Sequence, residues 1–89
     1  MPRIFFTPHL QKHLACQPAE VPGTTVAAAM AVVFDRQPAL RGYLLDDQGC
    51  VRQHVMIFVD NRPLGDRARL SDPVAEGSEI YVMQALSGG

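Results

Sequence analysis

The residues with the clearest chemical potential are the last two, Gly88 and Gly89, which follow an apolar stretch over residues 80–87. Neither glycine has a Cβ, so the carboxylate of Gly89 can enter a narrow channel that a larger side chain would block. That carboxylate is an anion at neutral pH and therefore a poor electrophile, so it must be activated before it reacts. Paired glycines also arise by chance or in frayed termini, so the rest of the sequence has to support this interpretation.

Other residues that could do chemistry do not form a complete site. Cys16 and Cys50 are too far apart for a CxxC motif, and a reducing compartment would leave both as thiols. His9 and His13 stand four apart and could share one helical face as metal ligands, but no second Cys/His cluster supplies the remaining ligands. The chain also has no GxxxxGKS/T loop, no GxGxxG loop and no paired carboxylates placed to hold magnesium. We therefore expect this chain to bind no metal and no cofactor.

The composition is typical of one compact domain, because 47% of the 89 residues are hydrophobic and only 19% are charged. A net charge of −1 provides no basic field, so nucleic-acid binding is set aside. The longest apolar run, residues 26–34, is too short to span a bilayer. The first residues lead straight into an apolar segment without a cleavage-site pattern. We expect a cytoplasmic protein.

Two helical segments are expected near the middle of the chain. After an irregular stretch, Pro22-Gly23 marks a turn, and Thr24 can cap the helix that follows. Pro38 forbids continuation of this helix, and residues 38–45 form a short second helical piece. The apolar stripe of the first helix is Val26, Met30, Val33 and Phe34. This stripe is expected to pack into the core and implies no cofactor.

Three segments alternate in the manner of strands, namely residues 3–7, 55–59 and 80–83. Residues 60–63 carry turn chemistry, and residues 70–74 form a short connector. Together with the helices they predict an α+β roll, a mixed sheet of four to five strands with one main helix packed across one face. We expect this domain to cover residues 1–84 and to leave residues 85–89 as a flexible C-terminal tail.

Alternation sends two sets of apolar side chains to opposite sides of the sheet. The set expected to face the helix is Ile4, Phe6, Val55, Ile57, Val59, Ile80 and Val82. The set expected to face outward is Phe5, Met56, Phe58, Tyr81 and Met83, joined at the root of the tail by Leu86 and Ser87. Such a patch usually marks a partner-binding surface, and methionine adapts to several partners, although loops or a homodimer could instead cover it.

Three arginines, Arg62, Arg67 and Arg69, lie near one another in sequence. They could steer an acidic partner toward the outward-facing residues. They could equally form a solvated loop, since exposed ion pairs contribute little. The sequence leaves both interpretations open.

A series of short motifs runs along nearly the whole chain. They are Gly23-Thr24-Thr25-Val26, Pro38-x-Leu40, Asp47-Gln48-Gly49, Val59-Asp60-Asn61, residues 70–80 and Gly88-Gly89. In this order they resemble the MoaD/ThiS group of ubiquitin-like β-grasp sulfur carriers. The sequence departs from the family pattern at Gly77-Ser78, at Asp60-Asn61 and at Gln84, where the family commonly has Gly-Asp, Asn-Gly and Pro. The length and the ending look closer to the longer carriers of cysteine and related biosynthesis, or to the small subunit of molybdopterin synthase, than to the thiamine carrier.

The resemblance implies a β-grasp roll whose Gly89 carboxylate is activated by another protein. An adenylating, E1-like enzyme would use ATP to form an acyl-adenylate, and a sulfur donor protein would displace AMP to leave a thiocarboxylate. A sulfur-accepting synthase in cofactor or amino-acid biosynthesis would then take the sulfur, with Gly88 giving the tail access to each active site. The chain would be a protein cosubstrate rather than an enzyme.

Three other roles fit the same sequence. Gly89 could be joined to lysines of target proteins through an isopeptide bond, as in a ubiquitin-like modifier. The chain could be the permanent small subunit of a molybdopterin-synthase-like complex. It could also be an interaction module whose glycines are incidental. An acyl-adenylate serves sulfur transfer and conjugation equally, so the sequence does not separate these two.

Overall fold

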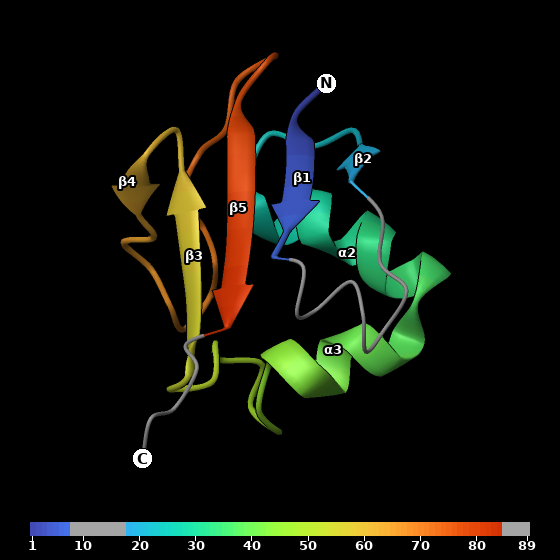
Figure 1. Cartoon of the computed structure of the whole chain (residues 1–89), viewed down its shortest axis with the longest axis vertical. Helices are drawn as coiled ribbons and strands as arrows, with labels where there is room; N and C mark the ends of the chain where they lie inside the picture. The colour runs from blue at the N-terminus through green and yellow to red at the C-terminus, as the bar shows by residue number, and fades with distance from the viewer. Residues whose placement is uncertain (8–17, 85–89) are drawn as a thin grey trace.

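One mixed sheet and two helices make up the described part of the chain, which in this computed structural model is residues 1–7 and 18–84 (Figure 1). The strands are β1 Arg3–Phe6, β2 Ala19–Glu20, β3 Val55–Val59, β4 Arg62–Pro63 and β5 Glu79–Gln84. The helices are α2 Val26–Arg36 and α3 Pro38–Leu44. The strands follow the order β2-β1-β5-β3-β4 across the sheet. The predicted α+β class with a sheet of four to five strands is confirmed.

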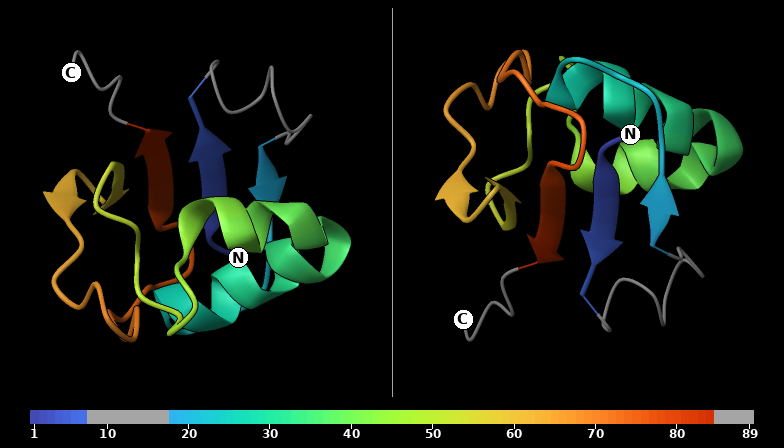
Figure 2. Two further views of the ribbon diagram at one scale, coloured as in Figure 1. Left: turned by 90° about the horizontal axis from the view of Figure 1, so that it is seen from below. Right: turned by 90° about the horizontal axis from the view of Figure 1, so that it is seen from above.

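The last strand lies at the centre of this sheet. β5 pairs in parallel with β1, where Ile4 stands opposite Ile80 and Phe6 opposite Val82. On its other side β5 pairs antiparallel with β3. A parallel pair cannot be joined by a tight hairpin, and the chain between β1 and β5 contains both helices. The two further views show that α2 and α3 lie on the same side of the sheet (Figure 2).

The core fills the space between the sheet and the two helices. Its inward-facing strand residues are the predicted ones, all buried: Ile4, Phe6, Val55, Ile57, Val59, Ile80 and Val82. Of the predicted helical stripe, Val26, Met30 and Val33 are buried, whereas Phe34 is only half-buried against the core. Successive helical residues are about 100° apart, so Phe34 lies at the margin of the stripe beside Val33.

The helix α2 begins one residue later than the sequence suggests. Thr25, and not Thr24, is the N-cap, since its Oγ1 accepts a hydrogen bond of 3.1 Å from the amide of Ala28. The amide of Ala27 donates to the carbonyl of Leu70 at 2.8 Å, so the connector before β5 satisfies a second amide of the first turn. Both candidate caps are threonines, and the contact with this connector decides between them.

The strands β2 and β4 are not predicted by the sequence pattern. β2 falls in the stretch expected to be irregular and pairs with β1, where Arg3 Nε donates to a Glu20 carboxylate oxygen at 2.8 Å. β4 follows a two-residue turn in which Asp60 and Asn61 have φ of 50° and 68°, the left-handed values of a tight hairpin. A strand of two residues is too short to show alternation, so only its pairing reveals it.

Two carboxylates hold the connector between β4 and β5. Asp72 accepts hydrogen bonds from the amides of Gly65 and Asp66, both at 2.8 Å. Asp66 in turn accepts hydrogen bonds from the Ser71 hydroxyl and from the Arg69 amide. These bonds hold the pKa of Asp66 below its ordinary value, and the hydrogen bond from Ser71 has the largest effect.

Replacing Val82 with aspartate is expected to unfold the domain, because Val82 is completely buried and the new charge would have no partner. We expect a loss of about 4 kcal/mol or more in the free energy of unfolding, measured by urea denaturation. Met83→Asp is the matched control, because Met83 is the next residue and is 40% exposed. Equal losses in the two variants would contradict the orientation of β5.

Asp66→Asn is expected to weaken the connector in a pH-dependent way. Because folding lowers the pKa of Asp66 below 3.8, the ionised carboxylate stabilises the fold above that value, and this stabilisation is lost as pH falls through the folded-state pKa. The variant should be less stable than the wild type at neutral pH, and the difference should shrink on acidification. Thermal unfolding across a pH series measures this. Asp47→Asn, at an exposed turn residue, is the control; a difference independent of pH would argue against the role of the charge.

Candidate functional site

The side of the sheet away from the helices carries the apolar set that we call the outer face: Phe5, Met56, Phe58, Tyr81 and Met83. Met56 and Met83 are each 40% exposed and Tyr81 is 37% exposed, whereas Phe5 and Phe58 are half-buried. Both helices lie on the other side, so neither covers these side chains (Figure 2). These side chains therefore face away from the helices, as the alternation in the sequence predicts. Their role in partner binding stays a prediction.

The outer face is continuous across three strands. Met56 is the cross-strand partner of Met83, and Phe58 is the partner of Tyr81, across the β3–β5 pair. Tyr81 also stands beside Phe5 of β1, and the two rings stack with centroids 4.8 Å apart and planes 16° from parallel. Contiguous exposed apolar surface of this kind is typical of interaction sites.

Several sequence-predicted residues lie outside the described residues. They are Leu86, Ser87, Gly88 and Gly89 of the predicted site, together with His9, His13 and Cys16. The proposed tail, residues 85–89, falls entirely in this group. The structure therefore describes where that segment starts, which is the end of β5 at Gln84.

Gln84 is held from two sides. Its backbone lies opposite Val55 of β3. The hydroxyl of Tyr43, on α3, donates a hydrogen bond of 2.7 Å to its Oε1. Neither Tyr43 nor Gln84 is among the site residues predicted from the sequence. A signal was present, because Gln84 follows Ile80 and Val82 on the inward side of β5, where a polar side chain needs a partner.

The three arginines differ in position, since Arg62 lies in β4 whereas Arg67 and Arg69 lie in the connector between β4 and β5. Arg67 is half-buried, and its Nη2 donates to the carbonyls of Arg52 and Val55 at 2.7 and 2.8 Å. It therefore ties the connector to the start of β3. Arg62 and Arg69 are exposed.

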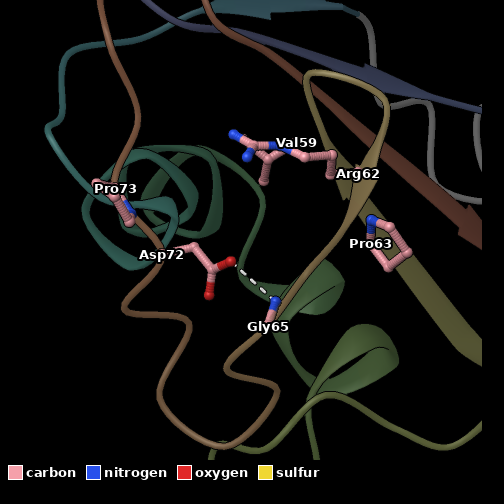
Figure 3. Close-up of a pocket in the computed structure, with 6 residues that line it drawn as sticks. All are labelled: Val59, Arg62, Pro63, Gly65, Asp72 and Pro73. Atoms are coloured by element: carbon pink, nitrogen blue, oxygen red, sulfur yellow. Dashed lines mark hydrogen bonds between the residues drawn. The ribbon is translucent and has the colours of Figure 1, made fainter.

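A cavity of about 260 Å³ lies between β4 and the connector (Figure 3). It is lined by Val59, Arg62, Pro63, Gly65, Asp72 and Pro73. Both carboxylate oxygens of Asp72 already accept backbone hydrogen bonds, and Figure 3 shows the one from Gly65. The volume is below the roughly 300–1,000 Å³ of small-molecule sites, and we assign this cavity no role.

Within residues 1–7 and 18–84, no three or more His, Cys, Asp and Glu side chains are grouped so that they could hold a metal ion. Cys50 is a half-buried free thiol. The helices of the same two ranges are all too short or too polar to cross a membrane.

Comparison with known proteins gives similarity in structure but not in sequence. No protein-family model matches the chain, and no curated protein is significantly similar to it. A chain of the Amycolatopsis orientalis BexX/CysO complex has a TM-score of 0.83 at 18% identity, with 100% of both chains covered. Mycobacterium tuberculosis CysO has a TM-score of 0.81 at 17% identity, covering 97% of this chain and 100% of CysO. Haloferax volcanii SAMP1 has a TM-score of 0.77 at 22% identity, covering 99% of this chain and 98% of SAMP1.

At identities this low, the agreement establishes the fold. It extends over nearly the full length of each protein, so it concerns the whole arrangement and not one motif. The chain therefore has the ubiquitin-like β-grasp fold of CysO and SAMP1, which confirms the fold expected from its resemblance to the MoaD/ThiS carriers.

Proposed function

We propose that this chain is a sulfur carrier whose Gly89 carboxylate is adenylated by a partner enzyme and converted to a thiocarboxylate. One observation carries the proposal: the central strand of a β-grasp sheet, β5, ends five residues before Gly89. Five extended residues reach roughly 17 Å, which is enough to enter a buried site on another protein. The chain supplies the carried group, and its partners supply the catalysis.

The proposed chemistry has two steps. A Gly89 carboxylate oxygen attacks the α-phosphorus of ATP, which forms the acyl-adenylate and releases pyrophosphate. A hydrosulfide ion, HS⁻, delivered by a donor protein then attacks the acyl carbon. AMP leaves with the carboxylate oxygen that bonded to phosphorus, and the sulfur loses its proton to solvent to give the thiocarboxylate. The thiocarboxylate sulfur then attacks an acceptor held by a synthase in cofactor or amino-acid biosynthesis. Water cleaves the resulting thioester, which leaves the sulfur on the acceptor and restores the Gly89 carboxylate. ATP is bound by the activating partner, and we assign this chain no cofactor and no enzymatic activity of its own.

We assign docking to the outer face. CysO occurs in a complex with BexX, and SAMP1 is a small archaeal modifier protein, so proteins of this fold do engage partners. An E1-like activating enzyme, a sulfur donor and a sulfur-accepting synthase would each cover this surface in turn. Met56 and Met83 suit successive partners, because the unbranched thioether side chain adapts its shape. We place this chemistry in the cytoplasm, where a reducing environment preserves the sulfur as a thiocarboxylate.

A second function, protein modification, is favoured specifically by the similarity to SAMP1. In this case a lysine amine of a target protein attacks the carbonyl carbon of the Gly89 acyl-adenylate, and an isopeptide bond forms as AMP and a proton leave. Peptide mass spectrometry of cell extracts separates the two functions. Lysine peptides linked to Gly89 would support conjugation, whereas thiocarboxylate without such peptides would support sulfur delivery.

Incubation of the purified chain with its activating enzyme, ATP and a sulfur source is expected to raise its intact mass by about 16 units, because one oxygen is replaced by sulfur. Deletion of Gly89 is expected to abolish this increase. The free energy of unfolding should change by less than about 0.5 kcal/mol, because a terminal residue contributes little packing. Intact-protein mass spectrometry and urea denaturation measure the two effects.

Gly42→Ala is the matched control for this deletion. Gly42 lies in α3, and a Cβ there would meet no atom within 4 Å, so the variant should fold and accept sulfur normally. An unchanged wild-type mass with every activating enzyme tried would refute the proposed function. An increase that persists without Gly89 would refute the assignment of the carboxylate.

Met56→Asp is expected to weaken docking, because it places a charge on the outer face directly opposite Met83. The KM for this chain in enzyme-catalysed ATP–pyrophosphate exchange should rise about tenfold, the effect of losing one well-packed interface residue. Ala31→Asp, on the exposed side of α2, is the control and should leave KM within about twofold of the wild type. Equal KM values for the two variants would place the docking surface elsewhere.

A further inference from the structure

The last inward-facing position of β5 is polar. Ile80 and Val82 are completely buried, and Gln84 continues their alternation toward the helices. Its side chain is half-buried at the edge of the core. An amide at such a position is stable only where its hydrogen bonds are made.

Tyr43 makes that hydrogen bond from α3. Its ring packs against the hydrophobic core, and its hydroxyl donates to Oε1 of Gln84 at 2.7 Å. The backbone on either side of Tyr43 is held in turn by Arg52. Arg52 Nε donates to the carbonyl of Gly42 at 3.0 Å, and the Arg52 amide donates to the carbonyl of Leu44 at 2.9 Å. The bonds from Arg52 therefore hold the backbone on both sides of Tyr43, and this fixes the position of the hydroxyl that donates to Gln84.

The end of β5 thus has two supports. Gln84 stands opposite the completely buried Val55 of β3, and its side chain reaches α3. Without the Tyr43 bond, the inward amide would lose its partner inside the edge of the core. The end of a strand frays readily when such contacts are missing.

We infer that Tyr43 and Gln84 are positioning residues, which fix the point and the direction from which residues 85–89 leave the domain. The inference rests on the proposed function, because this direction matters only if Gly89 is delivered to an activating enzyme. Fraying at Gln84 lengthens the chain between the docked body and the carboxylate, and spreads Gly89 over a larger volume. The fraction of docked carriers with Gly89 placed for attack then falls, while docking itself is unchanged.

This inference is tested by measuring the steady-state adenylation of the full chain with the ATP–pyrophosphate exchange assay. Tyr43→Phe and Gln84→Leu are each expected to lower kcat about fivefold, the equilibrium equivalent of one neutral hydrogen bond, with KM unchanged. Gln84→Glu keeps an acceptor oxygen and should retain the wild-type kcat. The double variant should be no slower than the slower single variant, because both remove the same bond. Gln53→Leu replaces an exposed glutamine and is the matched control.

Amide hydrogen exchange provides a readout that needs no partner. Exchange at Met83, the residue before Gln84 in β5, should be faster in Tyr43→Phe by a similar factor, while exchange at the buried Ile57 in β3 stays unchanged. Unchanged exchange at residue 83 would overturn the inference, as would faster exchange with an unchanged kcat or a change confined to KM. If the wild type is not adenylated, all variants are equally inactive, and the proposed function fails together with the inference.

Discussion

The parallel pairing of β1 with β5 is the constraint on which the rest of this structure depends. Parallel neighbours need a crossover, and the chain makes it with α2 and α3 on one side of the sheet (Figure 2). Ile4, Ile80 and Val82, which meet along this pair, are completely buried. The pairing also puts β5 between β1 and β3, so the strand that leads to residue 85 is an interior strand with neighbours on both sides.

Because both helices lie on one side of the sheet, its two faces are chemically different. The chain segment between β2 and α2 passes very close to the first turns of α2. Gly23 shows how close this passage is. A Cβ at Gly23, whose φ is 152°, would lie 2.8 Å from the amide nitrogen of Ala29, so only glycine fits before the Thr25 cap. The middle of the β4–β5 connector contacts the same helix turn, where the carbonyl of Leu70 accepts a hydrogen bond from the amide of Ala27. The helix start is thus fixed by backbone on both sides.

Local patterns predicted most of the fold, because face alternation and proline breaks depend only on neighbours in sequence. What they left undetermined depends on partners far along the chain. β2 and β4 exist only as pairings, and the cap falls on Thr25, which forms a bridge with Pro73 of the connector. Arg67 bonds two carbonyls and does not lie in a solvated loop. Of the site, alternation predicted the orientation of the outer face, whereas the Tyr43–Gln84 contact joins residues 41 apart. The roles of Gly88 and Gly89 stay predictions.

The central position of β5 couples docking to delivery in the proposed function. Met83 is the last outward side chain of the strand, and Gln84 is the next residue, turned inward and held. A partner that covers the outer face therefore contacts β5 one residue before this strand ends. The flanking strands β1 and β3 extend that contact to both sides of β5. Docking alone then raises the local concentration of the Gly89 carboxylate at the partner's active site, and no separate recognition of the glycines is required. In the proposed function the partners supply all of the catalysis, because this chain only has to place the Gly89 carboxylate.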